Sequence, residues 1–191
     1  MAYRLYQTEG LVLASRPYGE ASCLFELLTP DLGLVLALAQ GVRKREARFK
    51  GHLQVGNLVQ LGLIRGREYW RLVSAHDSLG VPSSLFFVWW PIFGRVLSLT
   101  RRLVIGEVAL PKVFADLKAG RSFLLTDTFT KEELGNYSLL AGARLLTFLG
   151  YALPLPETAF SDWTKVNLRL PPERRVACVQ EVRRALEASH L

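Results

Sequence analysis

The sequence predicts an α+β protein, with a small β-barrel over residues 1–79 and a helical domain over residues 80–191. Two observations lead to this class. Short apolar runs separated by turn signals fill the first 77 residues, and from Pro82 onward the apolar spacing becomes helical. Because 50% of the 191 residues are hydrophobic and 21% are charged, the chain has ample material for a core.

The expected strands are short runs bounded by Gly, Pro and Asp. They are Leu5–Arg16, Ser22–Thr29, Gly33–Ala39, Asn57–Ile64 and Glu68–Ala75. The first pair is joined by "RPYGEA", the second by the turn signal "PDLG", and the last by the connector "RGR" centred on Gly66. The third run, "GLVLALA", is apolar at every position, which is expected of a strand covered on both faces.

The longest interruption in this series falls between the third and fourth runs. Five short antiparallel strands with a long third-to-fourth connection favour a Greek-key barrel of the oligonucleotide/oligosaccharide-binding type, the OB-fold. An SH3-like barrel and an open meander are the alternatives that strand spacing alone leaves open.

Three segments in the second half are expected to be helical. Ser84–Gly106 is long enough for one helix or a proline-kinked pair. Thr130–Gly150 begins with a capping box, Thr130 and Glu133, and lines one face with Leu134, Tyr137, Ala141, Leu145 and Phe148. A last helix opens at Pro171 and Pro172, with Val176, Val179, Val182 and Leu186 on its apolar stripe.

Residues 78–94, "SLGVPSSLFFVWWPIFG", carry no charge over 17 residues. A spanning helix needs about 20 predominantly apolar residues, and this stretch contains two prolines and three serines. We therefore expect a buried helix of a soluble domain. The alternative is that its apolar part, residues 85–93, serves a membrane-peripheral or protein-interaction role.

Signatures of catalysis are missing from the sequence. There is no P-loop, no G-x-G-x-x-G and no G-x-S-x-G, and His52, His76 and His190 lie far apart without metal-ligand spacing. The two cysteines, Cys23 and Cys178, are too few for a cysteine zinc site or a disulfide framework. We expect a binding protein in a reducing, cytoplasmic setting, with no cofactor and no metal.

The strongest functional signal is charge. The formal net charge is +7 and the isoelectric point is near 9.7, which favours polyanionic partners, nucleic acid above all. The glycine-bounded segment Gly41–Gly51, "GVRKREARFKG", holds five cations and one aromatic ring. Its cations, which we call the basic segment, are Arg43, Lys44, Arg45, Arg48 and Lys50. A solvated loop face is the plain alternative for such a run.

The loops that rim the binding face of an OB-fold barrel extend this signal. The first carries Arg16 and Tyr18, and the second carries Arg65 and Arg67. The fifth strand adds Tyr69 and Trp70, of which one is expected to face the core. Cations neutralise phosphates and aromatic faces stack bases, so the combination predicts binding to single strands with little sequence preference.

An ordered set of motifs resembles the bacterial recombination mediator RecO family. Its pieces are Gly10–Leu13, Arg16–Glu20, the turn Leu27–Gly33, Ala39–Arg43, His52–Gln54 and, downstream, "LLTFLGYALPL" at Leu145–Leu155. Gln40 stands where the family often has Lys, and "PLPETAFSDWTKV" lacks the four-cysteine zinc site that many members carry there. The chain is also short for the family.

The resemblance implies a non-catalytic recombination mediator of DNA repair, acting as a monomer in the cytoplasm at the nucleoid. It would bind single- and double-stranded DNA, anneal complementary strands and, with RecR, help to load RecA onto DNA coated by single-strand-binding protein (SSB). The acidic, apolar C-terminal tail of SSB would contact the helical domain. Candidate residues for that contact are Arg95, Arg101, Arg102 and Arg144. An RNA-binding OB-fold protein remains the main alternative.

Overall fold

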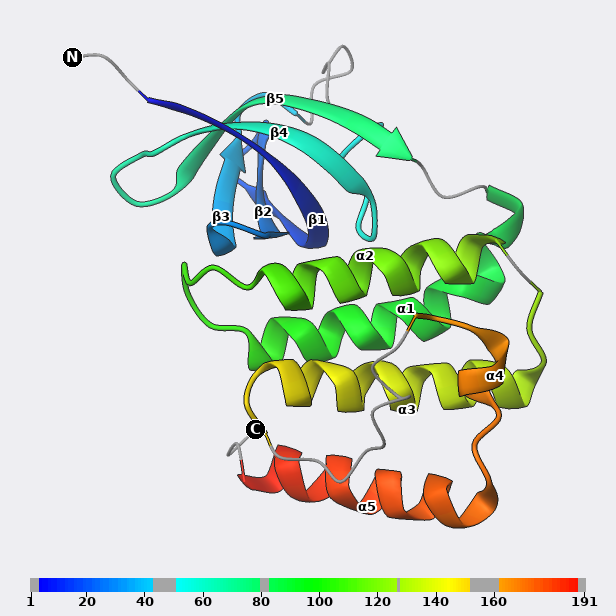
Figure 1. Cartoon of the computed structure of the whole chain (residues 1–191). Helices are drawn as coiled ribbons and strands as arrows, with labels where there is room; N and C mark the ends of the chain where they lie inside the picture. Colours follow the sequence, from blue (N-terminus) through cyan, green and yellow to red (C-terminus); the bar gives the residue numbers. More distant parts are fainter. Residues whose placement is uncertain (1–3, 43–50, 80–82, 127, 152–161, 189–191) are drawn as a thin grey trace. The chain divides into compact units, whose positions relative to one another are not determined.

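The structure is a computed structural model that describes residues 4–42, 51–79, 83–126, 128–151 and 162–188 (Figure 1). Its strands are β1 (Leu5–Tyr18), β2 (Ser22–Thr29), β3 (Gly33–Ala39), β4 (Leu58–Ile64) and β5 (Trp70–Leu79). Its helices are α1 (Ser83–Leu103), α2 (Pro111–Thr126), α3 (Lys131–Phe148), α4 (Lys165–Leu168) and α5 (Pro172–Ala188). The predicted order of a barrel followed by helices is confirmed.

The five strands close into a barrel in the order β1-β2-β3-β5-β4 (Figure 1). All neighbours are antiparallel except β3 and β5, which run parallel and pair Ala37 with Trp70 and Leu38 with Arg71. This Greek-key closure is that of an OB-fold barrel. The long third-to-fourth connection is required because β4 must cross back to pair with β1.

Strand β1 serves two neighbours along its length. Its first half, Leu5–Leu11, pairs with β4, and its second half, Leu11–Tyr18, pairs with β2. The register shifts between Val12 and Ala14, and such an irregularity lets a strand bend sharply. The bend allows the second half of β1, with Arg16 and Tyr18, to pair with β2 while the first half pairs with β4.

The barrel interior is filled by alternate side chains of the strands. Strand β3 differs from the expectation of burial on both faces. Val35, Ala37 and Ala39 are at most 1% exposed, whereas Leu36 on the opposite face is 37% exposed. Its continuous apolar run therefore reflects one core face and one partly solvated face of a closed barrel.

A segment from outside the predicted barrel also packs on it. We call residues 104–110, between α1 and α2, the strap. The amide of Leu34 donates to the carbonyl of Gly106 (3.1 Å), and the amide of Leu110 donates to the carbonyl of Pro30 (3.2 Å). Gly33, at φ 71°, must be glycine here because a Cβ would lie 2.1 Å from the carbonyl oxygen of Val108.

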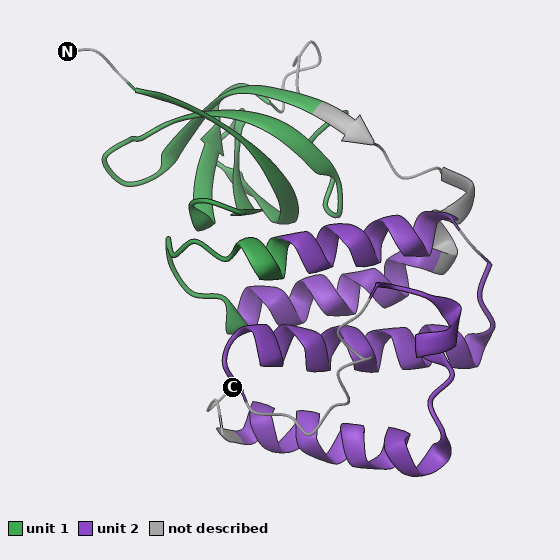
Figure 2. Ribbon diagram, in the orientation of Figure 1, with its two compact units in different colours: residues 1–82, 103–114 green, residues 83–102, 115–191 purple. Residues whose placement is uncertain are grey.

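The chain divides into two compact units (Figure 2). The barrel unit comprises residues 1–82 and 103–114, and the helical unit comprises residues 83–102 and 115–191. The strap thus belongs to the barrel unit by its contacts, although it lies far beyond the barrel in sequence. A folding boundary between residues 79 and 80 stays a prediction.

Helix α1 spans Ser83–Leu103 with Pro91 inside it, close to the expected Ser84–Gly106. Helix α2 was not predicted. Its buried positions follow a helical spacing, but Asp116, Gly120 and Arg121 occupy three of them. Because polar and small residues stand where an apolar stripe is sought, the periodicity is hidden in the sequence.

Helix α3 begins as the sequence predicts. The Thr130 hydroxyl accepts from the amide of Glu133 (3.2 Å), and the Glu133 carboxylate accepts from the amide of Thr130 (2.8 Å). These two bonds form the capping box and satisfy two amides that a helix start leaves unpaired. Tyr137, Ala141 and Leu145 are buried as expected.

Helix α5 turns a different face inward than the sequence suggested. Val176 and Val179 are 57% and 47% exposed, whereas Cys178 and Ala185 are buried. The Cys178 thiol is free, and burial raises its pKa. The expected apolar stripe was wrong at Val176 and Val179, whereas Val182 and Leu186 are half-buried. Cys178 and Ala185 were missed because they are small and carry little weight in a hydrophobic pattern.

Candidate nucleic-acid interface

The β1–β2 and β4–β5 loops meet at one end of the barrel, as predicted for the rim of an OB-fold binding face. The rings of Tyr18 and Tyr69 pack edge to face, with centroids 5.7 Å apart. Tyr18 is 43% exposed and Tyr69 is half-buried. The pair therefore offers aromatic surface to solvent from two loops that are about 50 residues apart in sequence.

The Tyr69 phenol stays neutral at physiological pH. Its hydrogen bond with Glu68, then burial, raise its pKa above the ordinary value, while the nearby positive charge of Arg16 opposes the shift. A neutral phenol does not repel phosphate. Arg16 is near the end of β1, two residues before Tyr18.

Trp70 is part of the core and not of the binding surface. It is 3% exposed, its indole Nε1 donates to Oε1 of Glu107 (2.9 Å), and its ring packs edge to face against Tyr6 at 5.2 Å. The expectation that one of Tyr69 and Trp70 faces inward is confirmed. Tyr69 is the residue left for stacking.

Arg65 is less available than the sequence suggested. Its guanidinium forms an ion pair with Glu107 of the strap and lies 5.0 Å from the centroid of the Trp70 ring. Glu107 lies 42 residues away in sequence, just after the helix expected over Ser84–Gly106. No sequence signal connected these two side chains.

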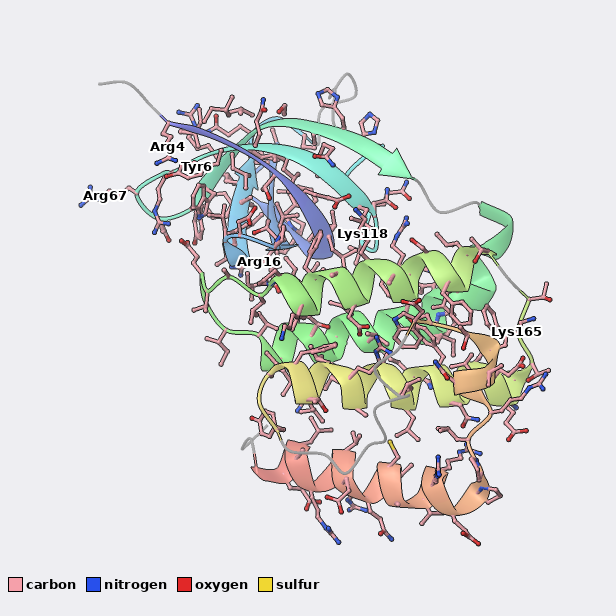
Figure 3. The ribbon with its side chains drawn as sticks, viewed as in Figure 1. Arg4, Tyr6, Arg16, Arg67, Lys118 and Lys165 are labelled. Atoms are coloured by element: carbon pink, nitrogen blue, oxygen red, sulfur yellow. The ribbon has the colours of Figure 1, made fainter. Side chains whose placement is uncertain are left out.

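Arg16, near the end of β1, and Arg67, in the β4–β5 loop, are both exposed. In Figure 3, Arg67 projects from the β4–β5 loop, and Tyr6 of β1 and Arg4, which precedes β1, lie near it. The guanidinium of Arg4 sits 4.9 Å from the centroid of the Tyr6 ring. Arg4 and Tyr6 were not singled out in the sequence, because they precede the first recognisable motif.

The five cations of the basic segment fall on residues 43–50, outside the described part of the chain. The flanks are described. Gly41 has φ 70°, and after Gly51 the chain returns to β4 through Asn57, whose side-chain amide donates to the carbonyl of His52 (3.1 Å). The segment thus leaves β3 and rejoins β4 at fixed points of the barrel unit.

Three of the four arginines proposed for a partner's tail, Arg95, Arg101 and Arg102, are exposed on α1. Arg144 is buried, so its prediction as a tail-binding residue was wrong. It is 5% exposed, its Nε donates to Oδ1 of Asp116 (2.8 Å), and its guanidinium lies 4.7 Å from the centroid of the Trp163 ring. A guanidinium engaged on both sides inside the helical unit is not a surface contact for an acidic tail.

Asp116 is the centre of this buried cluster. It also accepts from the indole Nε1 of Trp163 (3.2 Å). Burial raises the pKa of Asp116, while its hydrogen bond and charge interaction with Arg144 act in the opposite direction. The cluster is therefore a structural connection between α2, α3 and the segment before α4.

The described residues offer neither a metal site nor a membrane-spanning helix. No group of three or more His, Cys, Asp or Glu side chains among them could hold a metal ion. None of their helices has the length and apolar character needed to cross a membrane. In the apolar stretch 85–93, Trp89 and Phe93 are buried with ring centroids 4.8 Å apart.

A closed five-stranded barrel of this strand order, with cations and exposed aromatics on the β1–β2 and β4–β5 loops, defines an OB-fold domain. Comparison with known proteins narrows this class to one family. Residues 1–76 match the family described as "Recombination protein O N terminal". Over these residues, the chain is similar to the N-terminal domain of the RecO family.

Curated relatives agree over the same region. The DNA repair protein RecO of Gloeothece citriformis is 35% identical over 79 residues, which cover 41% of this chain and 28% of the relative. That of Bifidobacterium adolescentis is 46% identical over 63 residues (33% and 26%), and that of Heliobacterium modesticaldum is 45% identical over 64 residues (34% and 23%). The chain thus spans about a quarter of the length of the relatives it matches.

Proposed function

We propose that this chain acts in recombinational DNA repair, where it binds DNA and anneals complementary strands without catalysing a reaction. The observation that carries the proposal is the Tyr18–Tyr69 pair, flanked by Arg16 and Arg67, at the loop end of a barrel that matches the RecO N-terminal family. The relatives are named DNA repair proteins.

The proposed mechanism needs only charge and stacking. Arg16, Arg67 and the basic segment would contact phosphates without regard to sequence, with Arg65 as a further cation. Neutralising two strands lowers their mutual repulsion, and bases held on Tyr18 and Tyr69 stay unpaired and exposed. Complementary bases can then pair, and the resulting duplex has fewer free bases for the aromatic rings to hold.

The proposed partners follow the same role. With RecR, the protein would help RecA to replace SSB on a single strand in the cytoplasm. Arg95, Arg101 and Arg102 on α1 would then contact the acidic tail of SSB. This part rests on the RecO family alone, since the matched relatives are aligned only over the barrel.

The direct test is an annealing assay on complementary oligonucleotides coated with SSB, with and without RecR. A mediator anneals coated strands faster than spontaneous pairing, whereas a generic polycation anneals only naked strands. Competition with RNA of equal sequence tests the alternative of an RNA-binding OB-fold protein. A strong preference for RNA would indicate contacts to the 2′-hydroxyl and would argue against repair.

Replacing Tyr69 by alanine is expected to weaken binding of a single strand by about 1–3 kcal/mol, the range measured for removing one base-stacking ring. The slope of log affinity against log salt should not change, because no charge is lost. Fluorescence anisotropy with a labelled oligonucleotide measures both quantities. Tyr69→Phe keeps the ring and should bind like the wild type; equal binding by the alanine variant would remove Tyr69 from the interface.

A further inference from the structure

Glu107 of the strap forms an ion pair with Arg65 at the loop end of the barrel. Its Oε2 accepts from Nη1 of Arg65, and its Oε1 accepts from the indole Nε1 of Trp70 at 2.9 Å. The Arg65 guanidinium lies over the Trp70 ring, 5.0 Å from its centroid. Both carboxylate oxygens are therefore engaged, one with a charged group of the β4–β5 loop and one with a buried ring.

The backbone on both sides of Glu107 is held against the barrel. The carbonyl of Gly106 accepts from the amide of Leu34, and the backbone of Val108 fills the space beside Gly33. Leu110 closes the strap through its hydrogen bond to Pro30. The backbone that carries Glu107 is thus held against the barrel, and the hydrogen bond from the Trp70 indole holds the carboxylate at the edge of that ring.

A carboxylate in this position competes with phosphate. A guanidinium recognises both anions through the same paired hydrogen bonds. The Arg65 and Glu107 side chains are 61% and 37% exposed, so solvent screens the pair and its attraction is weak. An ion pair that is weak and reachable can exchange its carboxylate for a phosphate of a bound strand.

We propose that Glu107 is a built-in competitor for phosphate, which lowers the affinity of this end of the barrel for single-stranded nucleic acid. It withholds Arg65 from the strand and places a repulsive negative charge beside it. The occupant it competes with is the sugar-phosphate backbone, so the inference rests on the proposed function. Lower affinity suits an annealing protein, because paired strands must be released.

The variant Glu107→Gln tests this inference. Its side chain has the same shape, and its carbonyl oxygen still accepts from Trp70, so the strap keeps its place while Arg65 is released. Each phosphate contact on a single strand adds about 0.7 to the steepness of the salt dependence. We expect E107Q to bind an oligothymidylate about fivefold more tightly at 0.1 M salt, with a slope steeper by about 0.7.

Two further variants separate the explanations. Glu187→Gln removes the same charge from another arginine, because Glu187 pairs with Arg183 on α5, and it should leave binding unchanged. Arg65→Ala added to E107Q should cancel the gain. The inference is overturned if E107Q binds like the wild type, if E187Q gives the same gain, or if the gain survives Arg65→Ala.

The failure of the proposed function looks different from the failure of this inference. A wild-type chain and an E107Q chain that both ignore the oligothymidylate at low salt overturn the proposed function, and this inference with it. A wild-type chain that binds, with E107Q identical to it in affinity and slope, leaves DNA binding in place and overturns only the role of Glu107.

Discussion

Replacing Arg144 by alanine is expected to destabilise the helical unit by about 3–5 kcal/mol, because the change leaves the Asp116 carboxylate buried without its charge partner. Asp116 is 8% exposed, and after the change it keeps the hydrogen bond from the Trp163 indole but loses the charge of Arg144. Urea unfolding followed by tryptophan fluorescence measures the loss as a lower midpoint.

Two controls give this prediction its meaning. Arg95→Ala removes an exposed arginine from α1 and should change stability by less than about 0.5 kcal/mol. Replacing both members of the pair, Asp116→Leu with Arg144→Met, should recover much of the lost stability, since no uncompensated charge stays buried. An unchanged midpoint for Arg144→Ala would contradict the buried position of this side chain. If Arg144→Ala also lost binding to the SSB tail, the loss would be explained by unfolding of the helical unit and not by a missing contact.

Replacing all five cations of the basic segment by alanine is expected to reduce the affinity for a single strand about three-thousandfold at 0.1 M salt. The estimate follows from five phosphate contacts, each adding about 0.7 to the slope of log affinity against log salt. The slope should accordingly become shallower by about 3.5. Urea unfolding of the variant should be compared with that of the wild type, so that a loss of affinity is not mistaken for unfolding.

The control for this prediction removes the same charge from the helical unit. In this control variant, five exposed cations are replaced by alanine: Lys131, Arg169, Arg174, Arg175 and Arg183. If general electrostatic attraction to a basic protein explained binding, both variants would lose affinity to a similar extent. A basic-segment variant with the wild-type slope would dismiss that segment as the contact site.

The barrel could be predicted from the sequence because its signals are local. Apolar runs, turn residues and the long third-to-fourth connection can be read along the sequence, and they favoured a Greek-key barrel of the OB-fold type. Helix α2 escaped prediction because Asp116, Gly120 and Arg121 interrupt its buried stripe. A buried carboxylate such as that of Asp116 needs a partner, and its partner Arg144 lies 28 residues away. No short window of sequence contains both residues.

The candidate interface shows the same division. Arg16, Tyr18, Arg67 and Tyr69 were found because OB-fold topology says which loops form the rim. The engagement of Arg65 with Glu107 depends on a strap that packs on the barrel from 42 residues away, and only the three-dimensional structure brings the two together. Arg144 was misjudged for a similar reason, since a lone arginine on a helix gives no sign of a buried acid on another.

The proposed function depends on one property, the attraction of this barrel's cations to a phosphate chain. Its most direct test is a titration of a labelled oligothymidylate with the full chain over a series of salt concentrations. The account predicts tight binding in dilute buffer and a slope of log affinity against log salt of about −3.5 or steeper. A chain that does not bind at low salt, or that binds with a slope near zero, would contradict it.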